Sequence, residues 1–172
     1  MLNLILRNSG RFIFLVLLQV LVLNDIHLFQ VFNPYLYILF ILLLPFETPN
    51  WLLMLLCAAL GLTVDAFSNT LGMHLSACIF AGFVRPSVLR IIAPREGYEF
   101  GMRPHVQIMG LAWTALYTLM MVLLHHFWLY MVEAFRFSAL PQVLLKTVVS
   151  GAFTIVLVLI SQYLTFKSKP AL

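Results

Sequence analysis

The densest group of polar side chains in this sequence lies at residues 61–74, GLTVDAFSNTLGMH, between two apolar runs. Its one acid is Asp65. A carboxylate in or beside an apolar helix is a candidate for function, because charge is costly in hydrocarbon. Gly61 lies four residues earlier on the same helix face, where a small residue lets a neighbouring helix approach the carboxylate. Three roles stay open for Asp65: a cap or pair between helices, a contact with a partner protein, and coupling to a proton or ion. Asn69 and Gly72 are further structural or partner-contact candidates in this group.

Arg85 and Pro86 interrupt a later apolar run at residues 73–92. A proline frees a backbone carbonyl and kinks a helix. The arginine has two interpretations. Its charged end reaches the lipid headgroups while its stem stays in the apolar layer, or it pairs with an acid inside the protein. Glu47 is the candidate acid, because both residues are expected near the same membrane face.

Four histidines are expected toward the opposite face and raise the hypothesis of a metal site: His27, His74, His125 and His126. No two of them have the i, i+4 spacing of paired ligands, and adjacent histidines on a helix point about 100° apart. We therefore expect no metal site. Cys57 and Cys78 lie within apolar runs and are predicted to be small buried hydrophobes rather than a disulfide.

Motifs of known catalytic centres are missing from the sequence. It has no G-x-S-x-G, no H-E-x-x-H and no Walker-type glycine loop, and its six acids are scattered along the chain. We therefore expect no catalytic centre and no cofactor. An intramembrane enzyme is the alternative.

The elements that must position these residues are predicted to be membrane-spanning helices. The chain is 63% hydrophobic and 9% charged, whereas a soluble domain carries roughly 25% charged residues. A soluble fold of 172 residues could not hide so much apolar surface. Six apolar segments are present, at residues 12–28, 29–46, 51–67, 73–92, 105–131 and 139–166. We predict an all-α fold with one domain over residues 1–172, in which six transmembrane helices form one bundle. The first three segments are marginal against the ~20 residues that a span needs, which implies thinning, kinking or a partly re-entrant path.

Lysine and arginine set the expected orientation. In a six-span topology only Arg136 and Lys146, of ten basic residues, lie outside. The positive-inside bias then places both termini in the cytoplasm, with a tail at residues 165–172, and the chain in the cytoplasmic (inner) membrane. The basic residues lie beside apolar runs rather than in one polar patch, so they do not indicate nucleic-acid binding.

The longest expected cytoplasmic connection is the loop at residues 93–104, called loop 93–104 below. Its charged and aromatic residues alternate: Arg95, Glu96, Tyr98, Glu99, Phe100 and Arg103. One interpretation is a solvated loop whose arginines bind anionic membrane lipids, at ~1 kcal/mol each. The other is a docking surface for a cytoplasmic protein, because mixed charge with aromatics suits a protein partner better than a lipid anchor.

Several of these segments together resemble a known family. Residues 44–49 (LPFETP), 61–74, Arg85-Pro86 and 93–97 (APREG) resemble the bacterial rod shape-determining protein MreD family, over roughly a third of the chain. The size, the expected span count and the basic ends are also similar to that family.

The resemblance implies a non-enzymatic scaffold of the cell-elongation machinery, which regulates cell shape and lateral peptidoglycan synthesis. The implied partners are an MreC-like bitopic protein, the MreB filament and a SEDS glycosyltransferase with its transpeptidase. The implied fold is similar to the substrate-binding membrane subunit of energy-coupling-factor transporters, and a small-molecule-binding subunit of that type is the alternative function. Such a subunit needs a polar pocket open to the outside, and the sequence leads us to expect few polar groups there.

Overall fold

Helix makes up 77% of the computed structural model, which describes residues 2–25 and 33–164, and no strand occurs in those ranges. The prediction of an all-α chain is therefore confirmed. The long helices are α1 (Leu2–Leu21), α3 (Asn50–Ser68), α4 (Met73–Ile91), α6 (Leu111–Ala134) and α7 (Leu140–Leu164). The short ones are η1 (Leu23–Asp25), α2 (Ile38–Leu42), α5 (Val106–Met109) and η2 (Phe137–Ala139).

Three helical stretches are long and apolar enough to cross a membrane, as expected of a membrane protein. They are α3, α6 and the stretch Phe137–Leu164, which joins η2 to α7. Helices α1 and α4 have similar lengths, 20 and 19 residues, but each contains two arginines. Helix length and hydropathy thus support three of the six predicted spans.

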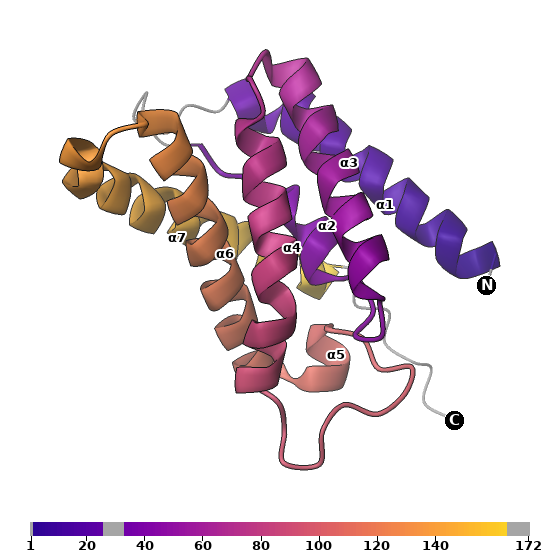
Figure 1. Cartoon of the computed structure of the whole chain (residues 1–172). Helices are drawn as coiled ribbons and strands as arrows, with labels where there is room; N and C mark the ends of the chain where they lie inside the picture. The colour runs from indigo at the N-terminus through magenta and orange to yellow at the C-terminus, as the bar shows by residue number, and fades with distance from the viewer. Residues whose placement is uncertain (1, 26–32, 165–172) are drawn as a thin grey trace.

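The long helices pack in the order α1–α3–α4–α6–α7 (Figure 1). Helix α4 lies between α3 and α6, and α7 packs mainly on α6. Large apolar side chains point outward from these helices, among them Leu55, Phe83 and Val148, which are exposed. In a membrane protein such an outer surface faces lipid, because lipid tails are as apolar as these side chains.

The second predicted span, at residues 29–46, differs from the prediction. Within its described part only α2 is helical. Pro34 and Pro45 lack the backbone N–H that a continuous helix needs, so they bound the short helix on either side. The segment still crosses the row of helices. Asn33, at its start, lines a pocket at one end of the molecule, and Glu47, just after it, contacts loop 93–104 at the other end.

The backbone of this crossing segment is buried, and side chains from the long helices satisfy it. Gln19 Nε2 donates to the Pro34 carbonyl at 3.0 Å, and Gln19 Oε1 accepts from the Tyr37 amide at 3.4 Å. Thr154 Oγ1 accepts from the Tyr35 amide at 3.0 Å. Non-helical backbone at membrane depth is tolerated where protein groups replace the missing water, and this segment meets that condition.

The middle of α1 and the end of α7 both lie near the residues that follow loop 93–104. Gln162 Oε1, in the last turn of α7, accepts from the Val106 amide at 3.1 Å. Burial, and then the nearby guanidinium of Arg11, lower the pKa of His105 below its ordinary value. The predicted tail at 165–172 lies outside the described residues. We call this side of the molecule the loop end, and the opposite side, with the α3–α4 and α6–α7 turns, the pocket end.

Candidate functional site

Asp65 holds the start of α4. Its Oδ1 accepts from the His74 amide at 3.1 Å and from the Thr70 hydroxyl, and its Oδ2 accepts from the Leu75 amide at 2.8 Å. The first amides of a helix have no partner within the helix, and a carboxylate there also meets the positive end of the helix dipole. The structure therefore places Asp65 as a cap between two helices.

The turn that brings Asp65 to α4 depends on Asn69 and Gly72. Both have left-handed backbone, with φ of 52° and 77°. Glycine adopts this conformation freely, and asparagine tolerates it better than most residues. The candidates of the 61–74 group thus meet at one tight connection.

Gly61 lets α3 contact the backbone of α4. A Cβ atom at Gly61 would lie 2.5 Å from Leu75 Cα and 2.6 Å from the His74 carbonyl oxygen. The small residue is required by this contact, one turn before the carboxylate that caps the same helix.

Arg85 is buried in the protein and does not reach the headgroups. Its side chain is 1% exposed, its Nε donates to Tyr117 Oη at 2.9 Å, and its Nη2 donates to the Leu44 carbonyl. The predicted pairing with Glu47 is wrong, because Glu47 instead accepts from the Gly101 amide. The arginine stabilises the end of α2 rather than forming an ion pair, and α4 continues through Pro86.

Loop 93–104 is fastened to the helices at two points. The Tyr98 hydroxyl donates to the Leu89 carbonyl at 2.7 Å. The Tyr98 ring stacks on the Phe46 ring, with the two ring centres 4.2 Å apart. Burial raises the pKa of Tyr98 above its ordinary value, which keeps the phenol a donor. Glu47 holds the second point through Gly101. The loop consequently has a fixed position at the loop end.

Beside and between these two points the loop has exposed side chains. Arg95, Glu96 and Glu99 are exposed, and Phe100 is 95% exposed. A large aromatic side chain held outward beside charges of both signs is a plausible contact for another molecule.

A polar pocket of about 380 Å³ lies at the pocket end, and we call it the polar pocket. Besides the charged pair described next, seven of its lining residues have polar side chains: Asn24, Asn33, Tyr35, Ser68, Thr70, His74 and Tyr130. The expectation of few polar groups on that side is therefore wrong. The residues come from α3, α4, α6, α7 and the segments near residues 24 and 33, which only the fold brings together.

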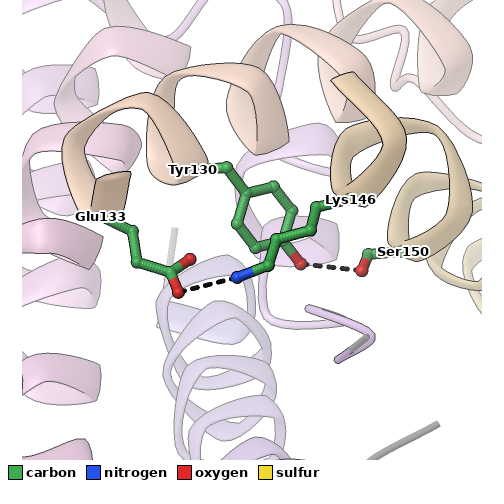
Figure 2. A network of polar contacts seen from close by, with 4 residues as sticks. All are labelled: Tyr130, Glu133, Lys146 and Ser150. Atoms are coloured by element: carbon green, nitrogen blue, oxygen red, sulfur yellow. Dashed lines mark hydrogen bonds and ion pairs between the residues drawn. The ribbon is translucent and has the colours of Figure 1, made fainter. Parts of the chain in front are cut away.

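One wall of the polar pocket is an ion pair between α6 and α7. Lys146 Nζ lies 2.9 Å from Glu133 Oε1, and both side chains are partly exposed (Figure 2). The ammonium also lies 5.4 Å from the centre of the Tyr130 ring, whose hydroxyl donates to Ser150 Oγ at 2.7 Å. A second cavity of about 300 Å³ shares Tyr130, Glu133 and Lys146, so the pair separates two cavities.

Behind the polar pocket, two of the four histidines contact Tyr37, and a third contacts one of these two. The Tyr37 hydroxyl lies 2.8 Å from His74 Nδ1 and 3.0 Å from His125 Nε2. His125 Nδ1 lies 3.4 Å from His126 Nδ1, and His126 Nε2 lies 3.1 Å from Thr154 Oγ1. His27 lies outside the described residues.

This chain of contacts is a network of hydrogen bonds between side chains. No cluster of histidine, cysteine and acidic residues within the described ranges has the arrangement of a metal site. Cys57 and Cys78 are buried as free thiols, and a Cβ at Gly82 would lie 2.8 Å from the Cys57 sulfur. The rings form one buried polar network, which rigidifies a structure when every member is satisfied.

The sequence did not reveal this network or the polar pocket. Tyr37 and His125 are 88 residues apart in the chain, and no spacing rule relates them. The available signal was the set of polar side chains within apolar segments, because a polar group in hydrocarbon must find a partner.

The chain matches no protein-family model, no curated protein and no solved structure.

Proposed function

We propose that this protein is a non-enzymatic scaffold of the bacterial cell-elongation complex in the inner membrane, with an MreC-like bitopic protein as its main partner. In this proposal the chain crosses the membrane six times, in a bundle similar to the membrane subunit of energy-coupling-factor transporters. Both termini and loop 93–104 face the cytoplasm. The regulated process is lateral peptidoglycan synthesis and hence cell shape.

The observation that carries the proposal is the fastened, outward-facing loop. The Tyr98 side chain and the Gly101 amide hold the loop, while Glu99 and Phe100 between them, and Glu96 just before them, are exposed. A contact surface gains affinity when its conformation is set before binding. The resemblance identifies the MreB filament as the cytoplasmic partner for this surface.

Three of the residues that carry the resemblance have structural roles that a scaffold needs. Gly61 and Asp65 join α3 to α4, and Arg85 holds the crossing segment. The crossing segment supports a second crossing in the N-terminal part of the chain, as an even number of crossings requires. None of these roles requires a chemical reaction.

The first test is affinity purification of the tagged protein in mild detergent. We expect to recover an MreC-like protein, and with it the SEDS glycosyltransferase and its transpeptidase. Recovery of none of these would contradict the scaffold proposal.

A second test addresses the docking surface. Phe100→Ala, and Glu96→Gln with Glu99→Gln, should reduce cross-linking to the filament and change cell width. Phe137→Ala is the matched control, because Phe137 is 86% exposed but lies in η2 at the pocket end. The glutamine variant makes the loop more positive, so lipid binding should hold or strengthen. Unchanged cross-linking and cell width in both loop variants would leave the loop as a lipid anchor only.

One observation favours the alternative, a small-molecule-binding subunit of an energy-coupling-factor-type transporter. The polar pocket lies at the end that faces outward in the proposed topology. Co-purification of a pair of transport ATPases in place of the elongation proteins would favour this second candidate.

A further inference from the structure

The protons of the histidine network can be assigned from one fixed hydrogen bond. The Thr154 hydroxyl has a single proton, which it donates to the Ser150 carbonyl at 2.9 Å. Toward His126 Nε2, at 3.1 Å, Thr154 can therefore only accept. His126 carries its proton on Nε2. Its Nδ1 is then an acceptor, because burial without a counter-charge favours the neutral ring.

The assignment continues along the network to the polar pocket. His125 Nδ1 must donate to His126, so His125 Nε2 accepts from the Tyr37 hydroxyl. The Tyr37 oxygen then accepts from His74 Nδ1. In a neutral ring the remaining nitrogen, His74 Nε2, is left with a lone pair. His74 lines the polar pocket, so the buried network supplies the pocket with a ring nitrogen that can only accept a hydrogen bond.

The ion pair of Lys146 and Glu133 adds a second requirement, for charged groups on the ligand. Lys146 has three N–H donors and Glu133 has four acceptor positions, and their mutual contact uses one of each. The pair has no net charge. An ion of one sign would pair with only one of these two side chains, whereas a zwitterion matches both with charge-assisted hydrogen bonds.

Exposed apolar side chains lie on the other faces of α7, away from the pocket wall. Leu144, Leu145 and Val148 flank Lys146 in sequence and are exposed. Lipid tails solvate such exposed apolar faces, so α7 contacts lipid on the faces that do not line the pocket.

We propose that the polar pocket binds a small zwitterion with a primary ammonium and a phosphate, which is the chemistry of phosphoethanolamine. The phosphate pairs with Lys146. The ammonium donates to Glu133 and to His74 Nε2. The source of this group is either phosphatidylethanolamine from the membrane or the free soluble molecule. The inference goes beyond the scaffold function, and it names the ligand of the second candidate.

The test measures binding to the purified full-length protein in detergent, by calorimetry and thermal shift. O-phosphoethanolamine should bind, and phosphocholine should bind about tenfold or more weakly, because its quaternary ammonium has the same charge but no N–H donor. Lys146→Met should lose binding by a similar factor. Arg95→Gln, which removes a cation at the loop end, should bind as the wild type does.

A second variant keeps the proposal falsifiable if Lys146→Met does not fold. Glu133→Gln leaves the pocket with a net positive charge. It should therefore bind inorganic phosphate more tightly than the wild type does and lose its preference for phosphoethanolamine over phosphocholine. Equal affinity of the wild type for both zwitterions, or unchanged binding in both variants, would overturn the proposal.

Nanodiscs distinguish the two sources. Native mass spectrometry should detect retained phosphatidylethanolamine, lost in Lys146→Met, if the source is the lipid. Binding of the soluble probe without retained lipid identifies the free molecule, and absence of both overturns the proposal. Recovery of the MreC-like partner with Lys146→Met tests the scaffold independently, because the proposed cytoplasmic surface is at the other end.

Discussion

At the residue scale, Gly61 shows how one missing side chain sets the distance between two helices. Its Cα faces the backbone of α4, where Leu75 Cα would lie 2.5 Å from an added Cβ. Real Cβ atoms do not approach backbone so closely, and backbone cannot rotate away as a long side chain can. The contact brings α3 near enough for Asp65 to reach the amides of α4.

Gly61→Ala should destabilise the protein by about 1–3 kcal/mol, because the helices must move apart. The measurement is thermal unfolding in detergent, followed by tryptophan fluorescence. Gly10→Ala is the matched control, since Gly10 also lies in a helix but has nothing within 4 Å of an added Cβ. The control should be neutral or slightly stabilised, because alanine is the better helix former. Equal melting of the two variants would contradict the close contact at Gly61.

Asp65→Ala should lower stability by about 1–3 kcal/mol, because two backbone amides of α4 lose their acceptor. Asp65→Asn keeps one side-chain oxygen and should lose less. The same unfolding measurement applies, together with the amount of protein in the membrane. If the alanine variant were as stable and abundant as the wild type, Asp65 would not be an essential cap.

At the element scale, the crossing segment of residues 33–46 shows why an apolar run need not be a helix. Its prolines prevent continuous helical bonding, so side chains such as Gln19 and Arg85 bond to its backbone instead. Loop 93–104 is also held by a bond between a side chain and the backbone. Here the side chain belongs to the loop: the Tyr98 hydroxyl donates to a carbonyl of α4.

Tyr98→Ala should release loop 93–104 and increase trypsin cleavage after Arg95, because the bond after Arg103 precedes Pro104 and resists trypsin. Tyr98→Phe loses the hydrogen bond but keeps the stacking on Phe46, so its cleavage should be intermediate. Phe100→Ala is the control, because that side chain is exposed and holds nothing in place. Similar cleavage rates in all three variants would show that Tyr98 does not fasten the loop.

At the scale of the whole molecule, the two ends differ in character. The loop end has mixed charges on a fastened loop, and the pocket end has a polar pocket with an ion pair. Arg95 lies at the loop end and Arg136 at the pocket end. Between them in the chain there is one long helix, α6. The proposed topology therefore requires them to face opposite sides of the membrane.

Cysteine labelling tests this topology. Arg136→Cys should react with an impermeant maleimide in intact cells, and Arg95→Cys only after permeabilisation. The native thiols of Cys57 and Cys78 are buried and give a low background. The reverse pattern would invert the orientation, and labelling of both from outside would mean that α6 does not cross the membrane.

The sequence by itself determined the helical, apolar character of the chain and the cluster at Asp65. Both are local properties. Composition decides whether the surface of the protein is more stable in lipid or in water, and the residues of the α3–α4 turn are close in the chain. Tertiary structure alone decided three other features. These are the buried contacts of Arg85, the non-helical crossing of residues 33–46, and the meeting of Tyr37 with His74 and His125 beside the polar pocket. Such contacts depend on which helices pack side by side. Helical periodicity gives the apolar face of each helix but not its neighbour.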